Sequence, residues 1–183
     1  MIHDPLLVDQ LGALEAIKFD GEVFRATRKS LDPLAPSTSG GRWVPKDTAP
    51  ILYTSCEPEG ALAEIAFHWA QLTPLPSKPV ALHRLRLTTK RTMRLLRANL
   101  ETFGVTWERY GELNYARTQE IGAAVAFLGY DGLLAPSARW ACENLMLFLD
   151  NHHAEENTLQ VTHTEEVDWL AWARSHGLVS AGE

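Results

Sequence analysis

The spacing of hydrophobic residues changes along the first third of the chain, and each spacing predicts a different element. Leucine and isoleucine recur at helical intervals from residue 6 to residue 17, which predicts an amphipathic helix ending near Lys18. Residues 22–25 then have the composition of a short strand, and 51–54 that of a second strand after Pro50. The Pro-, Ser- and Gly-rich run 32–41 predicts a loop that is too short to separate two domains.

A helix predicted over residues 57–72 carries the first candidate for chemistry. Proline at position 58, with an acidic residue on either side, suits the first turn of a helix. When the helix is projected at about 100° per residue, its apolar residues gather on one side and Glu64, His68 and Gln71 fall on the other. Glu64 is therefore expected to face away from the main core.

The second half of the chain mixes strands and helices without a regular alternation. The pattern predicts strands at 80–88, 133–135, 144–149 and 158–163, the last of them an edge strand, with a helix or loop at 91–100 and helices at 115–128 and 164–176. An irregular order of this kind favours an α+β architecture over a doubly wound parallel sheet. We expect one α+β domain that spans residues 1–183.

Composition narrows the class of protein. The chain is 45% hydrophobic and 22% charged, and its apolar stretches are far shorter than the roughly 20 residues of a membrane span. The first ten residues carry acid where a secretory signal carries base, so we expect a cytoplasmic protein with no membrane partner. Cys56 and Cys142 are far apart, and the histidines lack the spacing of zinc ligands, so no metal is expected.

Charge is unevenly distributed along the chain. The formal net charge of −6 argues against direct binding of nucleic acid. Residues 78–97 nevertheless carry seven basic residues and no acid, whereas residues 143–183 carry eight acids and one base, Arg174. The basic segment has two interpretations: it is a solvated face, or it attracts an anionic ligand or an acidic protein surface.

The segment 37–43 joins a flexible turn to residues that can bind a nucleotide. Paired glycines allow close approach of the backbone, Arg42 can grip a phosphate, and Trp43 can form a flat apolar wall. The alternative is a turn followed by a core tryptophan. The chain has no phosphate-binding loop of the G-x-x-x-x-G-K-S/T or G-x-G-x-x-G type and no G-x-S-x-G nucleophile motif.

Seven short blocks, taken together and in order, resemble the RES domain family. The blocks are F-R-A-T-R, S-G-G-R-W, L-Y-T-S, A-L-A-E-I-A-F-H, T-Q-E-I-G, L-L-A-P-S-A and E-N-L-M-L-F. The family is named for an arginine, a glutamate and a serine, which match Arg25, Glu64 and Ser137 here. Further motif positions match Arg42, Tyr53 and Asn144. The motifs span about residues 24–153, so the N-terminal helix and the acidic C-terminal helix are expected to pack on this core.

The chain departs from the family pattern at two places. An aromatic residue often follows the first arginine, where this chain has Ala26. The motif G-G-R-W is often followed by N-x-x-G, where this chain has Val44, Pro45, Lys46 and Asp47. Neither departure touches the three residues that name the family.

The resemblance implies a fold and a function. Members are typically toxins of bacterial toxin–antitoxin pairs that an Xre-type antitoxin neutralises, and their fold is similar to that of ADP-ribosyltransferase toxins, a central sheet flanked by helices. Their known activities are degradation of NAD and ADP-ribosylation of a protein. The resemblance thus implies NAD as substrate, with Glu64, Arg25 and Ser137 as catalytic residues. Arg42, Tyr53, Asn144 and Trp43 would then bind NAD.

The chemistry of NAD cleavage suits this set of residues. Breaking the nicotinamide–ribose bond releases neutral nicotinamide, so no general acid is needed, but a carboxylate such as Glu64 can stabilise the oxocarbenium-like ribose. The sequence does not choose between water, phosphate and a protein as acceptor. Two alternatives stay open at this stage: a transferase strictly specific for one target protein, and a binding module for a nucleotide or a protein that has no enzymatic activity.

Overall fold

The computed structural model of the chain describes residues 3–37 and 39–180. The elements in that part are α1 (Pro5–Gly12), β1 (Ala16–Arg28), β2 (Ile51–Ser55), α2 (Pro58–Trp69), β3 (Val80–Arg94), α3 (Arg97–Thr102), a 3-10 turn (Trp107–Arg109), α4 (Ala116–Phe127), β4 (Gly132–Pro136), β5 (Glu143–Phe148), β6 (Leu159–Val167) and α5 (Trp169–Ser175). The expected α+β class is confirmed. Across those residues no helix combines the length and the apolar character needed to cross a membrane.

The six strands form one mixed sheet organised around β3. β1 runs antiparallel along β3 from residue 80 to residue 93, and β6 pairs with the other edge of β3 at residues 80–87. The end of β3 pairs in parallel with β4, which pairs with β5, and β5 pairs with β2. β2 returns to β1 at the pair Phe24 and Ser55. Five strands thus close a circuit, and β6 lies outside it.

Apolar side chains fill the inside of this circuit. The buried members all come from its five strands: Val23, Leu52, Leu85, Leu87, Leu134, Leu145 and Leu147. Alternate residues of a strand point to opposite faces, so the neighbours of these residues are free to face helices or a cavity.

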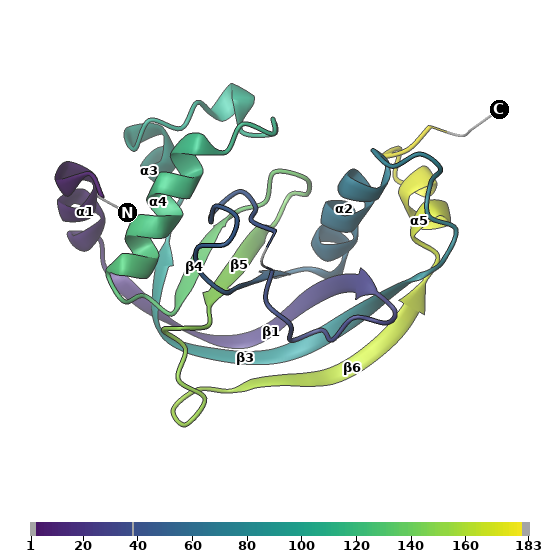
Figure 1. Ribbon diagram of the computed structural model, residues 1–183, viewed down its shortest axis with the longest axis horizontal. Helices are drawn as coiled ribbons and strands as arrows, with labels where there is room; N and C mark the ends of the chain where they lie inside the picture. The colour runs from purple at the N-terminus through teal and green to yellow at the C-terminus, as the bar shows by residue number, and fades with distance from the viewer. Residues whose placement is uncertain (1–2, 38, 181–183) are drawn as a thin grey trace.

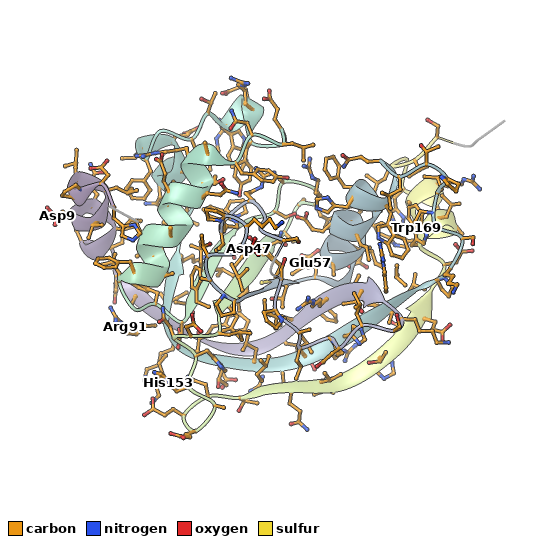
Figure 2. The ribbon with its side chains drawn as sticks, in the orientation of Figure 1. Asp9, Asp47, Glu57, Arg91, His153 and Trp169 are labelled. Carbon is orange, nitrogen blue, oxygen red and sulfur yellow. The ribbon has the colours of Figure 1, made fainter. Side chains whose placement is uncertain are left out.

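The helices pack in two groups on the sheet (Figure 1). α1, α3 and α4 lie at one end of the long β1–β3 ribbon, and α2 and α5 lie at the other. The second group is held by Trp69 of α2 and Trp169 of α5, whose rings meet edge to face with centroids 5.3 Å apart. Trp169 lies on the side of α5 toward α2 (Figure 2).

The N-terminal prediction is wrong beyond Gly12. The expected helix ends there, and Ala16 already pairs with Met93 of β3. Ile17, which matched the helical spacing, belongs to a strand of 13 residues rather than the four predicted. Residues 16–28 pair with β3 along their whole length, and this pairing satisfies the backbone N–H and C=O groups of both strands. The extended conformation is therefore more stable here than a further helical turn.

The C-terminal half needs two similar corrections. β3 continues to Arg94, so only part of the expected helix or loop at 91–100 is helical, as α3. Residues 164–167, expected to begin the last helix, extend β6 along β3. The helix begins only after Asp168, whose carboxylate accepts a hydrogen bond from the backbone N–H of Ala171 at 3.0 Å. β6 pairs with β3 alone and is the expected edge strand.

The basic segment 78–97 is largely paired with acids. Its ion pairs are Arg84–Glu22, Arg86–Asp20, Lys90–Glu156, Arg94–Glu143 and Arg97–Glu101. Two of the acids, Glu143 and Glu156, come from the acidic C-terminal part of the sequence. The positive charge of the basic segment is therefore largely offset by acids that lie beside it, as expected for a solvated face.

Candidate active site

A cavity of about 610 Å³ opens where the strand circuit meets α2 and the loop after β1. This volume lies within the usual range of sites for small molecules. Six of the seven predicted site residues line it: Arg25, Arg42, Trp43, Tyr53, Glu64 and Asn144. Ser137, the seventh, is joined to the cavity through its hydrogen bond to Glu64.

Glu64 is held by two neutral donors from distant parts of the chain. Its Oε1 accepts a hydrogen bond from Ser137 Oγ at 3.0 Å and another from Asn144 Nδ2 at 2.8 Å. The buried side of α2 is formed by small and apolar residues such as Ala63 and Ala66, so Glu64 faces the cavity as expected. Because neither donor is charged, the carboxylate is fixed in place without being neutralised.

The Ser137 hydroxyl is oriented by its own turn. Its Oγ accepts the backbone N–H groups of Arg139 at 3.1 Å and Trp140 at 3.3 Å. With both acceptor positions in use, its single proton is directed to Glu64.

Arg25 is half-buried and has one buried donor that is not in use. Its Nη1 is buried and has no hydrogen-bond partner among the described residues, and the same holds for Asn144 Oδ1. Burial lowers the pKa of Arg25, an effect that Asp32 partly offsets. A guanidinium stays protonated even so, and an unpaired buried cation is costly. An anionic or polar ligand in the cavity would supply the missing partners.

Arg42 is clamped between two aromatic rings. Its guanidinium carbon lies 4.6 Å from the ring centroids of both Tyr110 and Tyr115. Burial lowers the pKa of Arg42, while the two tyrosines and Glu64 act in the opposite direction and Arg139 reinforces the decrease. Both rings contact the guanidinium, and its Nη2 donates to the carbonyl of Glu112 at 3.5 Å, so the other N–H groups are what Arg42 can offer a ligand.

The side chain of Tyr53 contacts the backbone of Trp43. The hydroxyl of Tyr53 accepts the N–H of Trp43 at 3.3 Å, and burial raises the pKa of Tyr53 to about 12. A Cβ atom on Gly41 would lie 2.7 Å from this hydroxyl, so the loop needs glycine there. Trp43 itself is only 2% exposed and packs in the core beside α4. Its side chain thus adopts the core role that the sequence offered as the alternative.

α4 contacts three successive backbone carbonyls of the same loop. Thr118 Oγ1 donates to the carbonyl of Arg42 at 2.7 Å, and Gln119 Nε2 donates to that of Gly41 at 2.9 Å. Gly122 lets the helix approach so closely that a Cβ atom would lie 1.9 Å from the carbonyl oxygen of Trp43. The T-Q-E-I-G block therefore serves to hold the S-G-G-R-W block in place.

Sequence reasoning assigned no site role to three residues that line the cavity: His68, Tyr115 and Gln119. Partial burial lowers the pKa of His68, with Arg139 and Arg42 adding to the decrease and Glu64 opposing it, which favours the neutral imidazole at pH 7. His68 gave a signal because it follows Glu64 by one helical turn, and Gln119 lies in the T-Q-E-I-G block, whereas Tyr115 gave none. Within residues 3–37 and 39–180, no three His, Cys, Asp or Glu side chains form a group that could hold a metal ion.

The RES domain family model matches residues 22–170. The chain belongs to the RES domain family. Among solved structures, it is similar to a chain in the crystal structure of the M. tuberculosis MbcT–MbcA toxin–antitoxin complex, with 19% identity and a TM-score of 0.80. The alignment covers 93% of this chain and 97% of that chain, which establishes the shared fold. No curated protein matches the chain.

One departure from the RES pattern has a backbone consequence. Asp47 stands where the family often has the glycine of N-x-x-G, and its φ is 56°, in the left-handed region that favours glycine. Aspartate is among the few side chains that adopt this conformation readily. The turn expected of the glycine is thus kept without it.

Replacing Gly122 tests whether close packing of α4 positions the RES loop. We expect Gly122→Ala to lower the free energy of unfolding by about 2–3 kcal/mol, because the added methyl group meets a carbonyl oxygen rather than a movable side chain. Gly12→Ala is the matched control, since nothing lies within 4 Å of its Cβ position at the end of α1. Urea unfolding measures both. Equal midpoints for Gly122→Ala and the wild type would contradict the role given to this contact.

Asn144→Asp tests the amide donor to Glu64. The introduced carboxyl would lie within hydrogen-bond distance of a second carboxyl, so one of the two keeps its proton to a higher pH in the folded state than in the unfolded state. The variant should therefore be least stable at pH 7, by about 1–3 kcal/mol, and recover as the pH falls toward 4. The double variant Glu64→Gln/Asn144→Asp should lack this pH dependence. Parallel pH profiles for the single variant and the wild type would refute the interaction.

Proposed function

We propose that this RES protein is a bacterial toxin that acts in the cytoplasm and cleaves NAD at the bond between nicotinamide and ribose. The carrying observation is that one cavity combines the fixed carboxylate of Glu64 with the half-buried guanidinium of Arg25, whose buried Nη1 has no partner among the described residues. NAD has the complementary charges, a dianionic pyrophosphate and a cationic pyridinium. The RES family and its similarity to a chain of a toxin–antitoxin complex support the assignment.

The two arginines would bind the anionic part of NAD. Arg25 offers a buried Nη1 that lacks a partner among the described residues, and Arg42 offers a guanidinium that two tyrosine rings contact. Planar guanidinium groups suit phosphate oxygens because they donate two parallel hydrogen bonds. Tyr53 lines the same cavity and would stack on the nicotinamide, while Asn144 Oδ1 would accept a hydrogen bond from an amide or hydroxyl group.

Glu64 would act on the reacting sugar. As the bond from C1′ to the pyridinium nitrogen breaks, its electron pair passes to nitrogen, nicotinamide leaves as a neutral molecule, and positive charge develops on the ribose. A nearby carboxylate stabilises that charge more in the transition state than in the substrate. The acceptor oxygen then bonds to C1′ and loses its proton. Ser137 keeps the carboxylate in position throughout.

Release of nicotinamide is the direct test. The wild type should release nicotinamide from NAD, and Glu64→Gln should reduce the rate by about 100-fold or more because the charge at the developing cation is lost. Glu59→Gln is the matched control, since Glu59 lies on the same helix and does not line the cavity. Chromatography of the products measures the rate, and circular dichroism confirms folding.

The same incubation distinguishes the acceptors. Free ADP-ribose identifies water, an ADP-ribose phosphate ester identifies phosphate, and added mass on a protein identifies a target-specific transferase. Full activity in folded Glu64→Gln would rule out the carboxylate mechanism. If the wild type releases no nicotinamide with water, phosphate or protein as the acceptor, the result would favour the binding module without enzymatic activity.

We further propose that an Xre-type antitoxin restrains the protein by closing the cavity. A segment inserted by the partner could place a carboxylate where the arginines would otherwise bind phosphate. Expression of the chain alone should arrest bacterial growth, and co-expression with the antitoxin encoded beside it should restore growth. Nicotinamide release should fall at least tenfold in the purified complex relative to the free toxin. Equal release by the free and bound forms would contradict closure of the cavity.

A further inference from the structure

A series of contacts between cationic and aromatic side chains leads from Arg97 to the cavity residue Arg42. Arg97 lies 5.0 Å above the ring of Trp107, and this ring stacks on Tyr110 with centroids 4.9 Å apart. Arg42 lies 4.6 Å from the ring centroid of Tyr110 and 4.6 Å from that of Tyr115. Tyr110 does not line the cavity, yet it forms one wall of the clamp around an arginine that does.

The hydroxyl of Tyr110 makes a separate contact with the Ser137 turn. It donates to the carbonyl of Pro136 at 2.8 Å. The same peptide unit ends in the N–H of Ser137, which donates to the carbonyl of Cys142 at 2.8 Å. The peptide plane that leads into Ser137 is thus held at both its oxygen and its nitrogen, and Ser137 Oγ in turn holds Glu64.

We propose that Tyr110 is a positioning residue with two separable effects: its ring orients Arg42, and its hydroxyl orients Ser137 and, through Ser137, Glu64. The assignment rests on the proposed cleavage of NAD. Tyr110 is 5% exposed, and this burial raises its pKa, so the hydroxyl keeps the proton that it donates. A tyrosine that only filled the core would not need the hydroxyl contact, because a phenyl ring supplies the same volume.

Tyr110→Phe separates the two effects because it removes the hydroxyl and keeps the ring. We expect kcat for nicotinamide release to fall about tenfold, since Ser137 and Glu64 lose one anchor. The dissociation constant of NAD, measured by calorimetry on a Glu64→Gln background, should stay within about twofold of the value for Glu64→Gln alone. The ring at position 110 still contacts Arg42 in this variant. Tyr130→Phe is the matched control: Tyr130 is also buried in this core beneath an arginine, Arg91, and does not line the cavity.

A second pair of variants tests the route of each effect. If the hydroxyl acts through Ser137, Tyr110→Phe should add less than about twofold to the loss of kcat already caused by Ser137→Ala, since residues that act in one chain are not additive. Tyr110→Leu removes the ring and should weaken NAD binding at least fivefold beyond Tyr110→Phe. Where Tyr110→Leu does not fold, Tyr115→Leu tests the same clamp by removing the other ring that contacts Arg42.

The outcomes separate this inference from the proposed function. No nicotinamide release by the wild type would overturn the proposed function and this assignment together. If the wild type releases nicotinamide and Tyr110→Phe has a kcat within twofold of the wild-type value, the role of the hydroxyl alone is overturned. An equal loss in Tyr110→Phe and Tyr130→Phe, or full additivity with Ser137→Ala, would also overturn it by showing a general effect on the core. Unchanged NAD affinity in the folded ring variant would overturn the role of the ring.

Discussion

The site depends on two hydrogen bonds to one oxygen of Glu64. The donors, Ser137 and Asn144, lie 73 and 80 residues further along the chain and reach α2 only because β4 and β5 pair beside β2. A basic partner would have held the carboxylate as firmly but would have cancelled its charge. Hydroxyl and amide donors keep the negative charge available, which is what a reaction that develops positive charge requires.

Sequence patterns predicted those parts of the fold that local interactions determine. α2, α4 and the short strands β2, β4 and β5 lie close to their predicted ranges, because a proline at a helix start, glycines and compact apolar runs mark them. The patterns failed where pairing between distant segments decides the conformation. Residues 16–21 and 164–167 became strand because β3 offers both of its edges to them.

The candidate site shows the same division. Arg25, Glu64 and the other family positions could be identified from short motifs, and the structure brings them to one cavity. Tyr110, Thr118 and Gln119 carry no chemistry that a sequence reveals, since each acts by holding the backbone or another side chain. Their roles appear only once the loop 41–43 and the Ser137 turn are placed in space. The residues of the candidate site could be named in advance, whereas those that hold them could not.

The closed circuit of strands also governs when the site can form during synthesis. β1 must wait for β3, and β2 must wait for β5, so apart from the β4–β5 hairpin the pairings of the circuit join segments far apart in the sequence. Contacts of this kind form late, because a long loop must close before they stabilise the chain. A nascent chain that carries Arg25 and Glu64 but not yet Asn144 has neither the circuit nor the fixed carboxylate. The complete site can therefore arise only after the ribosome has made most of the protein.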